Sequence, residues 1–382
     1  MDKLHSAESI RGLACIAVVF SHLLGTFYPQ LHSFYDSALP KFELAENIYN
    51  SPFAFLYSGT GAVFVFFVLS GYVLTLSSLK TTDYFKRFKV SIVKRYPRLA
   101  IPALFSCLLM YLCLQVNVDV SKTAEAIQIV KIQPNLFDAI YNGTVGAFAT
   151  GDQRYNRALW TMRIELIGSF IIYIACLLQY KPALRHLFLL IIAIVSIKIP
   201  EQIQLGFYSF IIGHYFYFFR NKIPEVLSIL IFILGLYFCG AHNNSASYSL
   251  FSSFLGEKTY EYLNFLGGIL IVFAVLKSKI IDKILDKKPL IWLGKVSFAI
   301  YLTHLSLIYI ICIPIFNYLL SYGFTFVSAS LIAMSITFVA ILFFSHFFSK
   351  YVDDAAIRFS NGLSNFVSDS YSKISKKYVK AD

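Results

Sequence analysis

The sequence predicts an all-α, polytopic integral membrane protein with about ten transmembrane helices. Of its 382 residues, 57% are hydrophobic and only 14% are charged, whereas a soluble domain carries roughly 25% charged residues. The apolar residues come in repeated uncharged blocks of about 16 to 24 residues, the length that crosses a bilayer of roughly 30 Å as a helix. Because lipid offers the backbone no hydrogen-bond partners, these blocks are expected to be helices rather than strands.

The first apolar block contains Arg11 and His22 and has no small-residue cleavage site. We therefore expect it to remain as a span rather than to be removed as a signal peptide. The fifth and sixth spans meet at a junction crowded by Lys198 and Glu201, and losing both would leave the termini on the same side. Residues 1–350 are expected to form one transmembrane domain and 351–382 a polar tail. The predicted spans are 10–27, 53–76, 99–117, 158–179, 187–203, 204–219, 224–240, 262–280, 297–316 and 327–349.

Basic residues predict the orientation of these spans. The 77–98 segment holds a cluster of Lys and Arg against the single Asp83, and further basic turns occur at 181–185, 220–222 and 277–288. With ten spans, all four lie on one side, so the positive-inside rule places both termini in the cytoplasm. The net charge of +12 is assigned to this asymmetry and not to nucleic-acid binding, because no basic face forms a separable domain.

The long loops 28–52 and 118–157 fall on the opposite side, and the partly apolar stretch 126–140 is expected to lie along the membrane surface. The six cysteines all fall inside apolar blocks and form no Cys-x-x-Cys pair. They are interpreted as small hydrophobic residues, with no disulfide framework or metal site implied. They are Cys15, Cys107, Cys113, Cys176, Cys239 and Cys312.

Ionisable residues inside spans are costly, so each is a functional hypothesis. Arg11 and His22 are eleven residues apart on the first span. They therefore share one helix face to within about 20° and lie roughly 16.5 Å apart along the axis, with His22 beyond the midplane. The alternative is an interfacial arginine and a buried histidine that bonds a neighbouring carbonyl.

Glu165 follows Trp160 and Arg163 early in the fourth span, which runs inward, so we expect Glu165 in the outer half at a depth similar to His22. A local ion pair with Arg163 is the alternative. His304 lies about two turns into the ninth span, where a structural core histidine is the simpler interpretation. The remaining span histidines, His214 and His346, are interpreted as structural or interfacial.

Arg95 and Arg98 lie where the third span leaves the cytoplasm. They are interpreted either as orientation charges whose stems lie along the membrane or as phosphate ligands. The second reading rests on the planar fork of donors that arginine presents to phosphate oxygens.

Five short motifs follow one another along these spans: Arg11-Gly12-Leu13 with His22, Phe66-Phe67-Val68-Leu69-Ser70-Gly71-Tyr72, Arg95-x-x-Arg98, Trp160-Thr161-Met162-Arg163-Ile164-Glu165, and Gly294-Lys295-Val296-Ser297 leading to Tyr301-Leu302-Thr303-His304. Together they resemble the motifs of the membrane acyltransferase family 3 over about residues 5 to 350. One departure is Tyr351-Val352-Asp353-Asp354, where the family often has Glu-Arg-Pro.

The resemblance implies O-acyl transfer, with an acetyl group expected, from cytoplasmic acyl-CoA to a sugar hydroxyl of a surface polysaccharide, lipopolysaccharide or related glycan. It implies the bacterial inner membrane as the location and acyl-CoA as a co-substrate, with no tightly bound cofactor and no metal. It also implies that Arg95-x-x-Arg98 engages CoA. A proton-coupled transporter of a small or sugar-like solute is the alternative, since it too would carry Arg, His and Glu in its spans. Against it stand the absence of internal repeats and the ordered motifs.

His22 is the expected general base, because a neutral histidine can take the hydroxyl proton as the oxygen attacks the carbonyl carbon. Arg11 is expected to bind a CoA phosphate or to orient the acyl arm. Glu165 is expected to fix a histidine tautomer or to hold an acceptor hydroxyl, and His304 to donate to the developing oxyanion. The residues grouped as donor-binding are Arg95, Arg98, Trp160 and His304.

Overall fold

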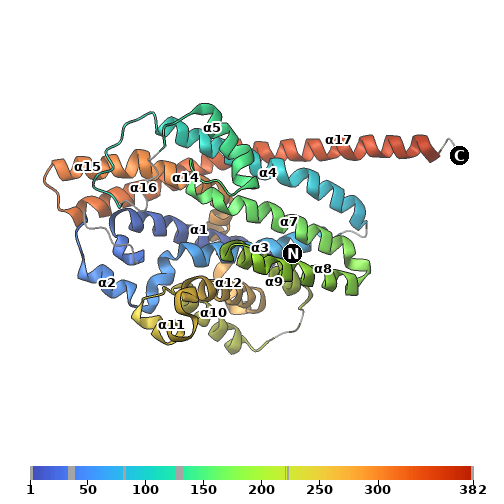
Figure 1. The fold of residues 1–382 in the computed structure, drawn as a ribbon, viewed down its shortest axis with the longest axis horizontal. Coiled ribbons are helices and arrows are strands. Elements are labelled where there is room, and N and C mark those ends of the chain that lie inside the picture. The colour runs from blue at the N-terminus through green and yellow to red at the C-terminus, as the bar shows by residue number, and fades with distance from the viewer. Residues whose placement is uncertain are drawn as a thin grey trace.

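A computed structural model describes residues 3–32, 39–80, 83–124, 132–219, 221 and 223–379. Over these residues the chain is a bundle of helices joined by short connections (Figure 1). Seven helices of the described chain are long and apolar enough to cross a membrane. They are built on α1 (Lys3–Phe27), α3 (Gly59–Ser78), α4 (Tyr84–Cys113), α7 (Trp160–Leu177), α12 (Thr259–Lys277), α14 (Lys288–Leu307) and α16 (Phe326–Phe348). The prediction of an all-helical polytopic membrane protein is confirmed.

The three other predicted spans correspond to α8 (Pro182–Val195), α9 (Glu201–Phe218) and α10 (Glu225–Cys239). Two of them are short, with 14 residues in α8 and 15 in α10. The 18 residues of α9 include Glu201, two glutamines and His214, which lower its apolar character. Short length in α8 and α10, and polar residues in α9, thus distinguish these three helices from the other seven.

Two segments predicted to lie outside helices are helical. Most of the 77–98 segment belongs to α4, which starts well before the predicted span because Asp83 caps it: the Asp83 carboxylate accepts a 2.9 Å hydrogen bond from the Lys86 backbone N–H. A hydropathy pattern cannot detect such a charged extension. The predicted polar tail is also a helix, α17 (Asp354–Val379), joined to α16 through a π-helical turn at Ser349–Asp353. Figure 1 shows α17 extending beyond the bundle after passing beside α4.

The ninth span is likewise longer than predicted. It begins at Lys288 and continues from α14 through a π-helical turn at Ile308–Cys312 into α15 (Ile313–Ser321). Such π turns often occur where a helix must present particular side chains. Helix α1 runs alongside α14 in the middle of the bundle. A Cβ on Gly12 would lie only 2.7 Å from the Gly294 amide nitrogen, so these two helices meet backbone to backbone.

The two ends of the bundle differ in charge, and we name them accordingly. The basic end holds the first residues of α1, α4 and α14 together with α13 (Lys279–Leu285) and α17; the basic turn at Arg220 and Lys222 lies outside the described residues. The neutral end holds the short helices of the long loops: α2 (Glu43–Tyr49), α5 (Leu136–Tyr141), α6 (Ala147–Ala149), α11 (Ser249–Leu255), 3-10 turns at Pro29–His32, Pro52–Tyr57, Arg157–Leu159, Ser196–Lys198, Ala246–Tyr248 and Gly256–Lys258, and a π turn at Asn142–Gly146. A further 3-10 turn, Leu178–Tyr180, follows α7 at the basic end.

The predicted surface stretch 126–140 is only partly described, since 125–131 lie outside the described residues. Its second half forms α5, in which Phe137 is 82% exposed. The six cysteines are all buried and unpaired, in keeping with their interpretation as small hydrophobic residues.

Candidate active site

A cavity of about 230 Å³ lies among α1, α3, α4, α7 and α14. Its charged lining residues gather toward the basic end, and its other walls are apolar side chains, among them Phe66, Phe67, Leu99 and Phe298. Tyr301 and Thr161 also line it, and they are joined by a 3.1 Å hydrogen bond between their hydroxyls. The charged lining residues are Glu8, Arg11, Arg95, Arg98, Glu165, Lys295 and Asp353.

Arg95 and Glu165 form an ion pair in this cavity. The Arg95 Nη2 lies 2.6 Å from Glu165 Oε2, and the two side chains are 16% and 13% exposed. The other carboxylate oxygen accepts a 2.9 Å hydrogen bond from the Ser70 hydroxyl. The predicted alternative, a local ion pair with Arg163, is thus replaced by a pair with Arg95 on α4, while the depth predicted for Glu165 stays a prediction. Helix α4 is longer than predicted, and its Arg95 reaches Glu165 in the second turn of α7.

Arg98 pairs with Asp353, a residue that the sequence reasoning did not select. The Arg98 Nη1 contacts the Asp353 carboxylate and also its carbonyl oxygen, the latter at 3.4 Å. Asp353 ends the π-helical turn between α16 and α17, and its side chain is 8% exposed. It stands where the chain departs from the family's Glu-Arg-Pro pattern. That departure, an acidic residue directly after the last span, was the available signal.

Arg11 ties α1 to α14. Its Nη2 donates to the Glu8 carboxylate at 2.6 Å and to the Gly294 carbonyl at 2.8 Å, and its Nε donates to the Ser297 hydroxyl at 3.2 Å. The two motifs that contain Arg11 and Ser297 therefore form one structural unit. Lys295 also lines the cavity and is exposed at its edge.

His22 and His304 face each other across the interface of α1 and α14, with ring centroids 5.1 Å apart. Neither histidine lines the cavity. Tyr301, which does line it, lies next to the pair, with its ring centroid 6.2 Å from that of His304. The shared face of Arg11 and His22 thus carries the arginine into the cavity and the histidine beyond it. His304 is fully buried, whereas His22 is partly exposed.

His304 and Trp160, both predicted to bind the donor, do not line the cavity. His304 Nδ1 lies 3.1 Å from the Ile300 carbonyl, which can only accept, so this nitrogen carries the hydrogen and is already engaged. A neutral His304 therefore has no N–H left to donate to an oxyanion. Trp160 packs edge-on against Phe67, with ring centroids 6.3 Å apart, and lies outside the cavity lining.

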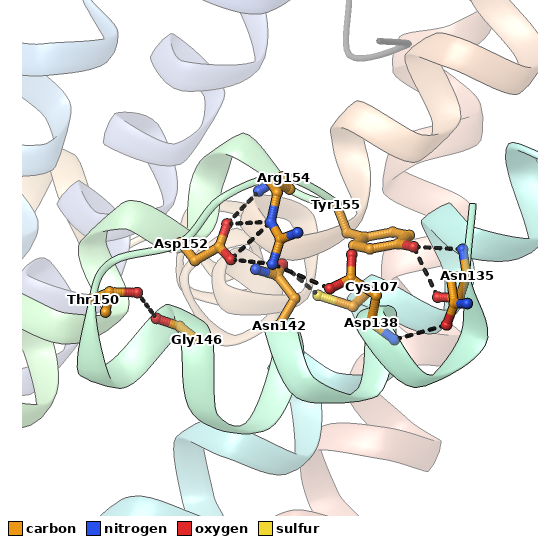
Figure 2. A network of polar contacts seen from close by, with 9 residues as sticks. All are labelled: Cys107, Asn135, Asp138, Asn142, Gly146, Thr150, Asp152, Arg154 and Tyr155. Carbon is orange, nitrogen blue, oxygen red and sulfur yellow. Dashed lines mark hydrogen bonds and ion pairs between the residues drawn. The ribbon is translucent and has the colours of Figure 1, made fainter. Parts of the chain in front are cut away.

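A polar network folds the neutral-end segment that precedes the Trp160 motif (Figure 2). Arg154 bridges two carboxylates, at 2.7 Å to Asp152 and 3.1 Å to Asp138. Burial alone would raise the pKa of Asp152, but its hydrogen bonds and the charge of Arg154 outweigh burial and lower that pKa. Next to this network, Asn156 donates a 2.8 Å hydrogen bond to the Leu302 carbonyl on α14. The network thus fixes the start of α7 against the helix that carries His304.

The two remaining span histidines have the surroundings expected of structural residues. His214 is buried, with its Nδ1 2.9 Å from the Thr75 hydroxyl, and the exposed His346 lies beside Trp292. The described part of the chain contains no cluster of three or more His, Cys, Asp or Glu residues that could hold a metal ion. The site thus consists of a cavity lined by four cationic and three carboxylate side chains. The His22–His304 pair lies beyond this cavity.

Comparison with known proteins adds the family. The acyltransferase domain family matches residues 4–348, nearly the whole chain. Neither the curated proteins nor the solved structures include a match. The matched range contains all five motifs and, apart from Asp353, every charged residue that lines the cavity. The chain belongs to the acyltransferase 3 family and is a multi-pass membrane enzyme of acyl transfer.

Proposed function

We propose that this enzyme moves an acyl group, with acetyl the first candidate, from acyl-CoA to a sugar hydroxyl of a cell-surface glycan in the bacterial inner membrane. The observation that supports this best is the order of groups along the bundle: Arg95, Arg98, Arg11 and Lys295 line one cavity, and the histidine pair lies just beyond it. The positive-inside rule puts the basic end in the cytoplasm, where acyl-CoA is found.

The cavity suits the phosphate groups of such a donor. Arg95 and Arg98 present guanidinium forks, which match phosphate oxygens better than the point charge of lysine. Both are held by carboxylates in the free protein, Arg95 by Glu165 and Arg98 by Asp353. Donor phosphates would exchange with these carboxylates, so that the arginines remain paired throughout. The apolar walls made by Phe66 and Phe67 suit the uncharged pantetheine arm and acyl group.

His22 is the proposed general base. His22 is half-buried and lies in the part of α1 nearer the neutral end, where a glycan would enter. The acceptor oxygen attacks the thioester carbonyl as His22 takes its proton, the C–S bond breaks, and the proton then passes to the thiolate to give the CoA thiol. The step therefore neither gains nor loses a proton overall.

The decisive experiment compares cells with and without the protein, with His22→Ala as the inactive control. Mass spectrometry of surface glycans should show an acyl modification only with the wild-type enzyme. In proteoliposomes, label from radiolabelled acetyl-CoA should appear on an acceptor or on the protein. Uptake of an unmodified solute without any acyl transfer would instead favour a transporter and reject the proposal. A His22→Ala variant with more than about a tenth of wild-type turnover would remove His22 as base, since a general base contributes about 10²–10⁴-fold.

A further inference from the structure

The histidine pair raises the question of what orients His22. A histidine that acts as a general base usually has its second ring nitrogen held by an acceptor, often a carboxylate. Glu165 was the expected candidate, but its two oxygens are engaged by Arg95 and Ser70. Among the described residues, the charged or titratable side chains near His22 are His304, His32 and Arg157, and none of these three is a carboxylate.

His304 has the required acceptor. Its Nδ1–H donates to the Ile300 carbonyl at 3.1 Å, so in the neutral ring Nε2 carries a lone pair and no hydrogen. That nitrogen is buried, and no hydrogen-bond partner for it is found among the described residues. A buried acceptor without a donor is costly, so a donor brought within reach of this nitrogen would be stabilised. The neighbouring ring across the helix interface is His22, with its centroid 5.1 Å away.

The two helices are fixed in the register that makes this pair. Gly12 allows α1 to touch the backbone of α14 at Gly294. Arg11 then bonds Gly294 and Ser297, and the Cys15 thiol donates to the Ser297 carbonyl at 3.1 Å. Contacts at successive levels therefore hold the helices side by side up to about two turns before the histidines.

We infer that His304 is a positioning residue, which accepts a hydrogen bond from one ring nitrogen of His22 and shares its proton during acyl transfer. This inference rests on the proposed function. As the acceptor oxygen bonds to the carbonyl carbon, its proton moves to His22, and the hydrogen on the other His22 nitrogen moves to His304 Nε2. When the C–S bond breaks, the proton that His22 took from the hydroxyl passes to the thiolate, which leaves as the thiol, and the proton on His304 Nε2 returns to His22. Both histidines end neutral.

The test uses two substitutions at His304. Alanine removes the acceptor, whereas glutamine places an amide oxygen near the Nε2 position, which can accept a hydrogen bond but cannot take a proton. His214→Gln is the matched control, because it changes another buried histidine at the separate α3–α9 interface. The rate is measured as release of the CoA thiol from acetyl-CoA by membranes that retain their native glycans.

His304→Ala should lower kcat by at least about a hundredfold, the range of a lost general-base contribution. Affinity for a nonhydrolysable acetyl-CoA analogue should stay within about twofold in both variants, because His304 does not line the cavity. His304→Gln should recover about tenfold in kcat and move the acid limb of the kcat profile to lower pH, since the positive charge is no longer shared between two rings. The control should change neither.

A His304→Ala variant with more than about a tenth of wild-type kcat would overturn the inference. An acid limb that stays in place in His304→Gln would do the same. Nitrogen NMR of histidine-labelled protein gives a readout that needs no substrate: the signal lost in His304→Gln should report the Nδ1–H tautomer, and the Nε2–H tautomer would refute the assignment. If wild-type membranes release no thiol, the proposed function fails instead, and the NMR result still decides the tautomer.

Discussion

Replacing Arg95 with alanine should weaken donor binding more than the loss of one contact explains. A charge-assisted contact to phosphate contributes about 1.5–3 kcal/mol, which corresponds to about ten- to a hundredfold in affinity. The substitution also leaves Glu165 unpaired, with its side chain 13% exposed in the cavity that the phosphates must enter. At about 6 Å and an effective dielectric constant of about 20, repulsion between unit charges adds about 2–3 kcal/mol. We therefore expect donor affinity to fall by more than about a hundredfold.

Glu165→Gln separates the two contributions. Added to Arg95→Ala, it removes the repelling carboxylate and should restore donor affinity about tenfold, given a repulsion of about 2–3 kcal/mol that is partly relieved by protonation. On its own it leaves Arg95 charged without a partner, so the empty protein should unfold at a lower temperature while the donor binds more tightly. Breaking one side of a buried pair costs about 3–5 kcal/mol, and donor phosphates would recover part of it.

The assay is binding of a nonhydrolysable acetyl-CoA analogue to detergent-solubilised variants, with thermal unfolding measured in parallel. Arg163→Ala is the control, since Arg163 lies on the same helix but does not line the cavity. The reasoning is refuted if the double variant binds no better than Arg95→Ala alone. It is equally refuted if Glu165→Gln weakens donor binding, because the carboxylate would then not compete with phosphate.

Three further predictions concern other parts of the molecule. Arg98→Lys keeps the positive charge but loses the forked guanidinium, so donor affinity in the same assay should fall about tenfold. Asp353→Asn removes the competing carboxylate and should raise donor affinity. Unchanged affinity in both variants would mean that Arg98 serves only as an orientation charge. At the neutral end, burial lowers the pKa of His32 to about 4 and of His242 to about 3. Both histidines are therefore neutral in the folded protein, and each should lower the free energy of unfolding by about 1.4 kcal/mol per pH unit as pH drops from about 6.5 toward 4. Thermal unfolding at a series of pH values measures this, and His242→Phe should make the free energy of unfolding depend less on pH. A cysteine at Lys86 should not react with an impermeant maleimide in intact cells, and reaction would reverse the assigned orientation.

The apolar blocks predicted the bundle well because membrane helices are defined by length and hydropathy alone. The same rule misplaced helix ends wherever charged residues continue a helix into water. Helix α4 starts at Tyr84 under an Asp83 cap, and α17 continues α16 through Asp353. Both extensions are charged, so no hydropathy pattern could reveal them, although the cap is a signal that can be read locally.

The sequence selected four of the charged residues that line the cavity, but it did not predict which residues they contact. Arg11, Arg95, Arg98 and Glu165 all line the cavity, whereas the ion pair between Glu165 and Arg95 was not predicted. Depth was counted along single helices, and that count does not say how far a long arginine reaches from a neighbouring helix. The partner of Arg98 was missed for the same reason, since Asp353 is 255 residues away in the chain.

Pairing explains why the cavity can be both basic and stable without its donor. Unpaired guanidinium groups in a part-buried cavity would carry a desolvation penalty of several kcal/mol each, so carboxylates from α1, α7 and the turn after α16 hold them. The excess of one cation, with Lys295 at the exposed edge, leaves a net attraction for an anionic donor. Because Arg98 lies on α4 and Asp353 at the start of the segment that packs against it, exchange at this pair also loosens a contact between two helices. Donor binding in this cavity is therefore expected to change the contact between α17 and α4 as well as the charge of the site.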